Sequence, residues 1–298
     1  MPAILTHLTA VERLAAHVNN LPAEFVRPLG EDLEYARFGA ALPELPWFGG
    51  WALGLEAWLG RGDPPHYAQM MTSKAPVAFG LKVAELVSTG ALVGTDAGLA
   101  FVAGYFTQLC VSRALEPLMR VLLAANAHQG ETPRRARSRM EWTQSLFLMQ
   151  ELHGSPLVGT PGVRSKLQIR KGYALKGIGR GLYELMRVAS LDALGEAPTQ
   201  WEVDGWVRGL SLFSLALGSP LGRLGALPSI HLKNRSLYQG PDVDVFAAVD
   251  RGLEHTRQVL SLLGPMVLNH RFTTRARHKV LEICPEGPLE AALDGQAA

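Results

Sequence analysis

The sequence is poor in cysteine, and this scarcity excludes several kinds of protein. Its 298 residues include only Cys110 and Cys284, which lie far apart in the chain. Two distant cysteines cannot form a zinc ribbon, and nothing suggests the disulfide framework of a small secreted protein. The N-terminus also lacks the charged region and the long apolar region of a secretory signal. We therefore expect a cytoplasmic protein.

A strong excess of charge of either sign is also absent. The formal net charge is +2, which gives no strong attraction to nucleic acid or to a membrane surface. The two most apolar stretches, residues 100–126 and 209–230, are interrupted by charged residues or by proline. A transmembrane segment is therefore not expected. Nucleic-acid binding is not expected either, because few aromatic residues accompany the basic clusters and could stack on bases.

Strand-like alternation and internal repeats are missing, whereas helical periodicity recurs along the chain. This pattern predicts an all-α fold, with one large multi-helix bundle over residues 1–284 and a flexible tail over residues 285–298. Thr9, followed by Glu12, is a plausible N-cap for the first helix. The main predicted helices cover residues 9–20, 76–89, 100–126, 134–154, 181–194, 199–217, 242–263 and 269–283.

The helix predicted at residues 100–126 is the centre of this bundle. Apolar residues cover nearly all of its faces, which is typical of a helix buried on most sides. Within it Gln108, Ser112 and Glu116 recur at intervals of four, so they lie on one stripe. Buried polar groups must face each other, a cavity, water or a ligand. The sequence therefore predicts a polar centre beside this helix.

Several fragments of the chain follow the order found in one enzyme family. They are MPAILTHLTAVERL, FGAALPELPWF, GDPPHYA, GYFTQLCVSRALEP, RARSRMEWTQSLF and NRSLYQGPDVDVFAAVDRGLEHTRQVLSLL, which together span roughly residues 1–265. In the order and local composition of these fragments the chain resembles the bacterial zinc-dependent phospholipase C family. The resemblance implies an all-helical fold whose polar centre holds a cluster of zinc ions.

Carried over residue by residue, the resemblance implies a depleted set of zinc ligands. His7 and His66 have the residue type of the family's ligands, and Glu44 stands where an aspartate is expected. The family's central helix carries His, Asp and His at four-residue intervals, where this chain has Gln108, Ser112 and Glu116. Glutamine and serine are poor ligands for zinc, so the resemblance does not imply that a three-zinc site is kept.

Arg137 is the most unusual of these replacements. The family has a histidine four residues before a glutamate in the helix after the central one, and this chain has Arg137 before Glu141. An arginine places a cation where a metal ion is expected. Because residues four apart in a helix are neighbours, we expect Arg137 and Glu141 to form an ion pair that replaces the charge of the metal.

Two functions follow from this pattern, and the first is favoured. The first is a catalytically degenerate relative without a cofactor, which binds a small molecule, a peptide or a partner protein at a pocket lined by Gln108, Ser112 and Arg137. The second is a metal-dependent hydrolase of phosphodiesters or phospholipids. It would hold one zinc ion on His7, Glu44 and His66, with Glu116 or Glu141 as the general base.

Two further possibilities concern the same helices. A metal-free enzyme could use the polar centre for other chemistry, because the side chains of Gln108, Ser112, Glu116 and Glu141 can position a substrate and move protons. Arg134, Arg135 and Arg139 cluster at the start of a predicted helix, where the helix dipole disfavours cations. This placement makes them a candidate site for an anionic partner.

Overall fold

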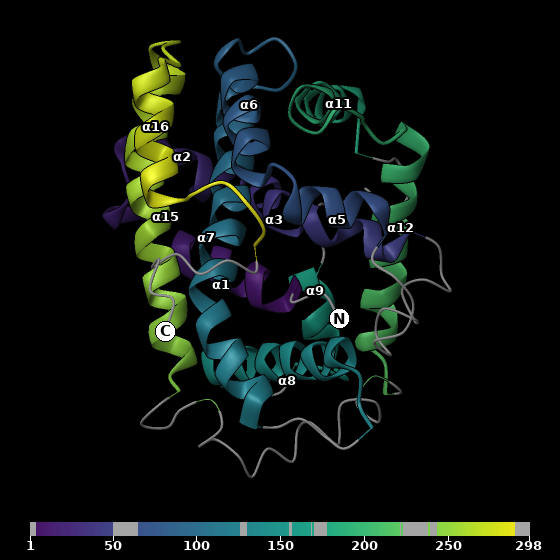
Figure 1. The fold of residues 1–298 in the computed structure, drawn as a ribbon. Coiled ribbons are helices and arrows are strands. Elements are labelled where there is room, and N and C mark those ends of the chain that lie inside the picture. The colour runs from purple at the N-terminus through teal and green to yellow at the C-terminus, as the bar shows by residue number, and fades with distance from the viewer. Residues whose placement is uncertain are drawn as a thin grey trace.

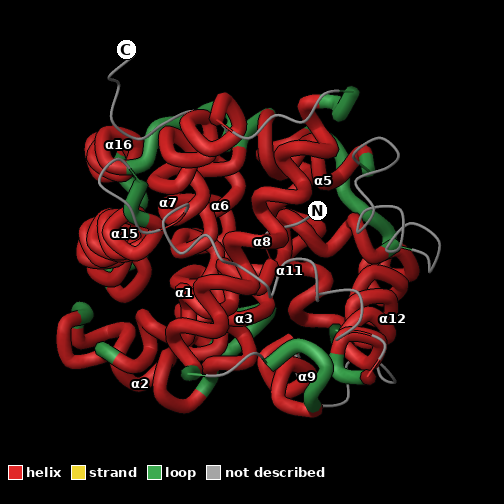
Figure 2. Tube along the Cα trace, turned by 90° about the horizontal axis from the view of Figure 1, so that it is seen from below, coloured by secondary structure: helices red, strands yellow, loops and turns green. Residues whose placement is uncertain are grey.

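In the part of the chain that the structure describes, all of the regular structure is helical. The computed structural model describes residues 4–49, 65–125, 130–154, 157–167, 169, 178–220, 222, 238 and 243–289. The predicted all-α class is confirmed, because these residues form helices and no strand (Figure 2). In chain order the elements are α1 Ile4–Ala16, the 3-10 helix η1 Val18–Asn20, α2 Ala23–Glu31, α3 Leu33–Ala41, the 3-10 helix η2 Leu42–Phe48, α5 His66–Ser73, α6 Pro76–Ser88, α7 Thr95–Ala125, α8 Pro133–His153, α9 Pro161–Leu167, α11 Arg180–Leu194, α12 Gln200–Leu217, α15 Val245–Leu268 and α16 Thr274–Ile283.

The long helix α7 is the core around which the other helices pack. It contacts α1, α2, α3, α6, α8 and α15, and Figure 1 shows α15 beside it and α8 crossing near its C-terminal end. Among the described helices α7 alone is long and apolar enough to cross a membrane, and 94% of its apolar window is buried inside the protein. Burial among six helices accounts for this apolar composition.

Two glycines allow α3 and α7 to cross at close range. A Cβ atom on Gly104 of α7 would lie 1.8 Å from the backbone oxygen of Ala36 in α3. A Cβ atom on Gly39 of α3 would lie 2.1 Å from the backbone oxygen of Phe101 in α7. Each helix therefore needs glycine at the point where the other crosses it, and this crossing sets the position of η2, which follows α3 directly.

The first helix begins earlier than predicted. α1 starts at Ile4, and the hydroxyl of Thr9 donates to the backbone oxygen of Leu5 instead of capping a helix. The prediction of an N-cap at Thr9 is wrong, because the apolar residues Ile4, Leu5 and Leu8 already pack in the core and extend the helix upstream. As a result His7 lies within α1 rather than before it.

The first residues of the expected C-terminal tail are held by the bundle. The carboxylate of Glu286 accepts hydrogen bonds from the backbone nitrogens of Val77 and Ala78, at the start of α6. Leu289 donates from its backbone to Thr72. An acidic group at a helix N-terminus satisfies free N–H groups and complements the helix dipole. The start of the predicted flexible tail therefore contacts the bundle through Glu286 and Leu289, and residues 290–298 lie outside the described part.

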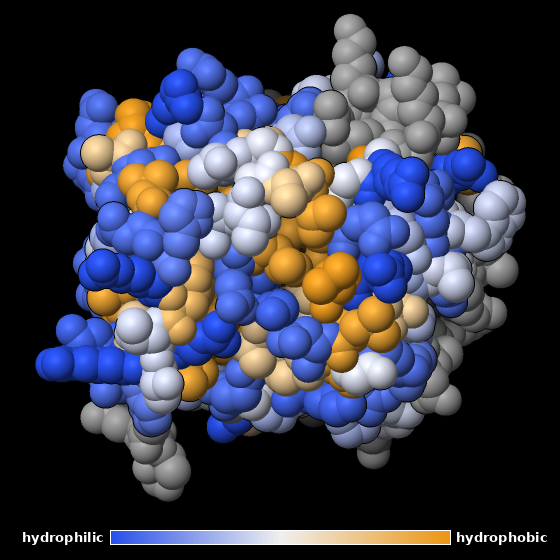
Figure 3. Space-filling view, turned by 90° about the horizontal axis from the view of Figure 1, so that it is seen from above, coloured by the Kyte–Doolittle hydropathy of each residue, from blue (hydrophilic) through white to orange (hydrophobic). Residues whose placement is uncertain are grey.

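Apolar side chains also reach the surface. Figure 3 shows one face of the molecule, on which apolar residues gather in a band between hydrophilic ones. On α12 the large exposed side chains are Trp201, Leu212 and Leu215, and Trp201 is 76% exposed. The guanidinium of Arg208 lies over the ring of Trp201, 5.6 Å from its centroid.

The crossing of α3 and α7 can be tested by filling the space that glycine leaves. We expect Gly104→Ala to lower the free energy of unfolding by about 1–3 kcal/mol or more, the usual effect of an overpacked core. The added Cβ would meet a backbone atom, which cannot move unless α3 shifts. Gly205→Ala on α12 is the control, because nothing lies within 4 Å of a Cβ added there. Denaturant unfolding of both variants measures the difference, and equal stabilities would contradict the close crossing.

Candidate functional site

The polar stripe of α7 faces other polar side chains at the centre of the bundle. Gln108 and Glu116 are 1% and 3% exposed, and Ser112 between them is half-buried. Ser112 contacts His7 of α1, Glu116 contacts Arg137 of α8, and Glu44 of η2 reaches the stripe through His7. The predicted polar centre is therefore present, and in the structure it has two halves, one around His7 and one around Arg137.

The first half joins three helical elements through His7 of α1. Nε2 of His7 lies 2.9 Å from the hydroxyl oxygen of Ser112, which also accepts a long hydrogen bond of 3.4 Å from the side-chain amide of Gln108. On the other side of the ring, Nδ1 of His7 lies 3.0 Å from Oε1 of Glu44 in η2. That contact has the distance of an ion pair, but Nδ1 is not aligned with the oxygen as a hydrogen bond requires.

Three buried atoms of this half lack hydrogen-bond partners among the described residues. They are Nδ1 of His7, Oε2 of Glu44 and Oε1 of Gln108. A buried polar atom without a partner costs about 1–3 kcal/mol, so unsatisfied atoms gathered at one place point to a bound group or to water. Two of these atoms are oxygens that can only accept. The half around His7 therefore presents acceptors to a ligand.

The second half is closed by Arg137 of α8. Its guanidinium donates to Glu116, with Nη2 2.7 Å from Oε2, and to Glu141, with Nε 2.9 Å from Oε1. Arg120, one turn after Glu116 on α7, also donates to Glu116 at 3.1 Å. The ion pair expected between Arg137 and Glu141 is present, and Glu116 joins it. Both candidate general bases are thus engaged by the same guanidinium.

Electrostatics connects the two halves. Burial raises the pKa of the Glu141 carboxyl above its ordinary value, and the negative charge of Glu44 adds to the rise while Arg137 opposes it. Glu44 and Glu141 are therefore close enough to interact, although they belong to different halves. The centre holds the carboxylates of Glu44, Glu116 and Glu141, and Arg137 is the guanidinium placed between two of them.

The residues present do not fit the three-zinc cluster that the resemblance implies. Within the described ranges, no group of three or more His, Cys, Asp or Glu side chains is placed to share a metal ion. Arg137 brings a positive charge between the two carboxylates that would face such an ion. Gln108 and Ser112 stand on α7 at two positions where the resemblance implies ligands, and neither glutamine nor serine is a good ligand for zinc.

His66 does not join His7 and Glu44. It lies at the start of α5, its side chain is 65% exposed, and its Nε2 contacts the carboxylate of Glu196. Of the three predicted metal-binding residues, the structure therefore brings together only His7 and Glu44. The sequence offered no sign of Glu196, because 130 residues separate it from His66.

The candidate anion site at the start of α8 also has partners inside the protein. The guanidinium of Arg139 pairs with both carboxylate oxygens of Glu131, at 3.1 Å and 2.9 Å. That of Arg134 lies over the ring of Trp47, 5.2 Å from its centroid. Arg135 is exposed. Two of the three arginines are thus engaged in the fold, and an anionic partner for this cluster stays a prediction.

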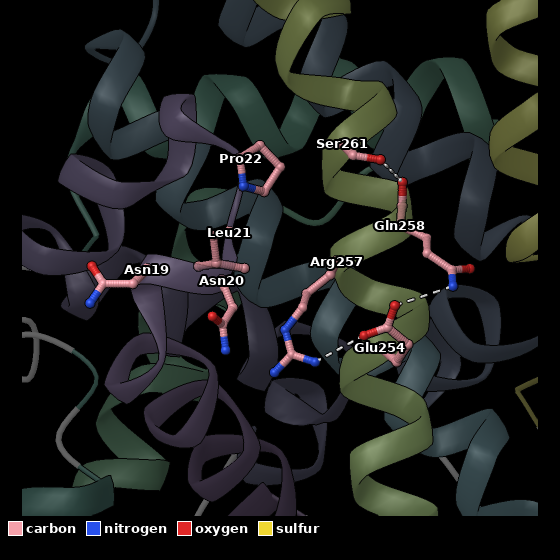
Figure 4. A pocket seen from close by; sticks show the side chains of 8 residues that line it. All are labelled: Asn19, Asn20, Leu21, Pro22, Glu254, Arg257, Gln258 and Ser261. Atoms are coloured by element: carbon pink, nitrogen blue, oxygen red, sulfur yellow. Dashed lines mark hydrogen bonds and ion pairs between the residues drawn. The ribbon is translucent and has the colours of Figure 1, made fainter.

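A shallow groove lies elsewhere, between α15 and the segment formed by η1 and the two residues after it. It encloses about 610 Å³ and is lined by Asn19, Asn20, Leu21, Pro22, Glu254, Arg257, Gln258 and Ser261. Figure 4 shows that Glu254 accepts hydrogen bonds from both Arg257 and Gln258 along α15. The charged groups of this groove pair with each other on one helix. The groove is therefore a weaker candidate for a ligand site than the polar centre.

Comparison of the chain with protein-family models, with curated proteins and with solved structures finds no match. The likeness to zinc-dependent phospholipase C therefore stays a prediction from the sequence.

The role of Arg137 in holding the centre together predicts a pH-dependent loss of stability. We expect Arg137→Met to lower the free energy of unfolding by about 3 kcal/mol near pH 8, because it leaves two largely buried carboxylates without their shared cation. The raised pKa of Glu141 means that the folded protein takes up a proton more readily than the unfolded chain. The loss should therefore shrink as the pH falls toward 5.

The matched control is Arg187→Met on α11. Arg187 pairs with one carboxylate, that of Glu184, whose side chain is 29% exposed. Exposed pairs contribute at most about 1 kcal/mol, so this variant should stay close to the parent protein at both pH values. Denaturant unfolding measures the difference in the free energy of unfolding between each variant and the parent protein, at pH 5 and at pH 8. A loss in Arg137→Met that is small, or that grows in acid, would contradict the role given to Arg137.

Proposed function

We propose that this protein is a metal-free relative of the zinc-dependent phospholipase C family that binds a small molecule at its polar centre. The observation that carries the proposal is the position of Arg137, whose guanidinium binds both Glu116 and Glu141. In this reading a side-chain cation takes the place of metal charge. The fold keeps its polar centre without the ions that the family uses for catalysis.

The half around His7 is the binding site in this proposal. The atoms without partners are a carboxylate oxygen of Glu44, an amide oxygen of Gln108 and a ring nitrogen of His7. The two oxygens are satisfied by a ligand that donates hydrogen bonds, through hydroxyl or amine groups. A peptide or a larger partner could present the same groups, but the depth of these atoms favours a small molecule.

A reduced zinc site is the second candidate, and one observation favours it. Nδ1 of His7 and Oε1 of Glu44 lie 3.0 Å apart without the alignment of a hydrogen bond, as two ligands of a shared ion would. His7 and Glu44 would hold the ion, which would polarise a phosphoryl oxygen and lower the pKa of a bound water. His66 would not contribute from its present position.

Metal content separates the two candidates. We expect protein purified without chelator and without affinity-tag histidines to contain close to zero zinc per chain by elemental analysis. The variant Gln108→His/Ser112→Asp/Arg137→His restores residue types of the family and should take up zinc, with a rise in its unfolding midpoint when zinc is added. Zinc at one ion per chain in the parent protein, lost in His7→Ala, would overturn the proposal in favour of the reduced site.

Ligand binding is tested separately by thermal unfolding with a panel of small polyols, amino alcohols and their esters. We expect at least one compound to raise the unfolding midpoint of the parent protein and to lose this effect in Glu44→Gln, which replaces an acceptor oxygen by a donor. Glu184→Gln on the surface of α11 is the control and should keep the effect. Shifts that persist in Glu44→Gln would place the binding elsewhere.

A further inference from the structure

Ser112, His7 and Glu44 form a chain of contacts of the kind that activates a serine nucleophile. The hydroxyl oxygen of Ser112 lies 2.9 Å from Nε2 of His7, and the opposite ring nitrogen lies 3.0 Å from Oε1 of Glu44. A histidine placed between a hydroxyl and a carboxylate, with one ring nitrogen toward each, can take a proton from the hydroxyl while the carboxylate stabilises the resulting cation. This arrangement of hydroxyl, histidine and carboxylate is recognised by its geometry and occurs on unrelated folds.

The directions of the hydrogen bonds agree with this role. The side-chain amide of Gln108 donates to the oxygen of Ser112, so the proton of Ser112 is left to be donated to Nε2 of His7. The other ring nitrogen, Nδ1, then carries the ring proton on the side of Glu44. The imperfect alignment of that proton with Oε1 matches the loose geometry that such contacts often have before a substrate binds.

Burial places the three groups in suitable environments. His7 and Glu44 are 3% and 8% exposed, whereas Ser112 is the least buried of the three. A buried acid and base are shielded from water, and a partly exposed hydroxyl can be reached by a substrate. Oε2 of Glu44 and Oε1 of Gln108 are buried beside these groups and have no hydrogen-bond partner among the described residues.

We propose that Ser112 is a nucleophile that cleaves neutral carboxylic esters, with His7 as its general base and Glu44 as the group that orients and stabilises His7. The proposal rests on the metal-free polar centre proposed above. A neutral ester is favoured over a phosphodiester because the centre contains three carboxylates, and the guanidinium of Arg137 is bound to two of them. A negatively charged substrate would be repelled by Glu44.

The reaction balances as a hydrolysis in two steps. The oxygen of Ser112 bonds to the ester carbonyl carbon while its proton passes to His7. The bond to the alcohol oxygen then breaks, and His7 gives the proton to the leaving alcohol. In the second step His7 takes a proton from water, whose oxygen bonds to the carbonyl carbon of the acyl group on Ser112. The bond from that carbon to the oxygen of Ser112 then breaks, His7 returns the proton to Ser112, and the acid leaves. The amide of Gln108, which donates to the oxygen of Ser112 at 3.4 Å, is the side-chain donor that we assign to the negative charge developing on the carbonyl oxygen of the ester.

The test is covalent labelling with a fluorophosphonate probe, followed by mass spectrometry of the intact chain and of its peptides. We expect one adduct per chain, on Ser112, and none in Ser112→Ala. The labelling rate should fall at least about 100-fold in His7→Gln, the usual contribution of a general base. It should also fall clearly in Glu44→Gln, which keeps the shape of the side chain. If His7→Gln fails to fold, the labelling rate of Glu44→Gln tests the proposal instead.

Ser145→Ala is the matched control. Ser145 lies on α8, is 1% exposed, and its hydroxyl bonds to Thr6, the neighbour of His7. This variant should label at the rate of the parent protein. An adduct on another serine, no adduct at all, or a rate unchanged in His7→Gln and Glu44→Gln would overturn the proposal.

A chelator separates this proposal from the one on which it rests. Labelling should proceed at the same rate after treatment with EDTA. If zinc-free protein fails to label, the nucleophile proposal fails and the metal-free binding site stands. If the protein carries stoichiometric zinc and EDTA abolishes labelling, both proposals fail together.

Discussion

The arrangement of the bundle depends on satisfying polar side chains that α7 carries into the core. Gln108 and Glu116 are nearly completely buried, and apolar helices alone would leave them without partners at a cost of about 1–3 kcal/mol for each orphaned group. Gln108 bonds to Ser112 of the same helix, and Ser112 and Glu116 have further partners in sequence-distant elements. The contact of Ser112 with His7 spans 105 residues, and that of Glu116 with Arg137 spans 21. α1 and α8 are therefore tied to α7 by specific polar contacts, in addition to packing, and their rotation about their own axes is restricted.

The two halves of the centre differ in how completely they are satisfied. Around Arg137, one guanidinium meets two carboxylates with geometry close to ideal. Around His7, three buried atoms find no partner among the described residues, and the contact with Glu44 is poorly aligned. A ligand that displaced the bonds around Arg137 would gain little free energy of binding. A ligand beside His7 would gain hydrogen bonds to the atoms that have no partner there. This difference is why we propose a functional role for His7, Ser112 and Glu44 and a structural one for Glu116 and Glu141.

Local pattern was enough to predict part of this arrangement. Intervals of four placed Gln108, Ser112 and Glu116 on one stripe, and the same spacing correctly paired Arg137 with Glu141, because both relations follow from helix geometry alone. Contacts that depend on how the helices cross could not be predicted from the sequence. Nothing in the sequence indicated that His66 would meet Glu196 or that Glu286 would cap α6. The prediction at Thr9 failed for a different reason. A good capping pattern was present, but the apolar residues before Thr9 pack in the core and extend the helix upstream.

A buried guanidinium and a buried metal ion give a polar centre different chemistry. A metal ion can accept several ligands, exchange one of them for water or substrate and lower the pKa of what it binds. A guanidinium holds carboxylates in fixed directions and cannot give up a proton at ordinary pH. Arg137 therefore balances the charges of Glu116 and Glu141 and fixes their positions. The groups of this centre that Arg137 does not hold include the hydroxyl of Ser112 and the imidazole of His7, which lie 2.9 Å apart and can transfer protons.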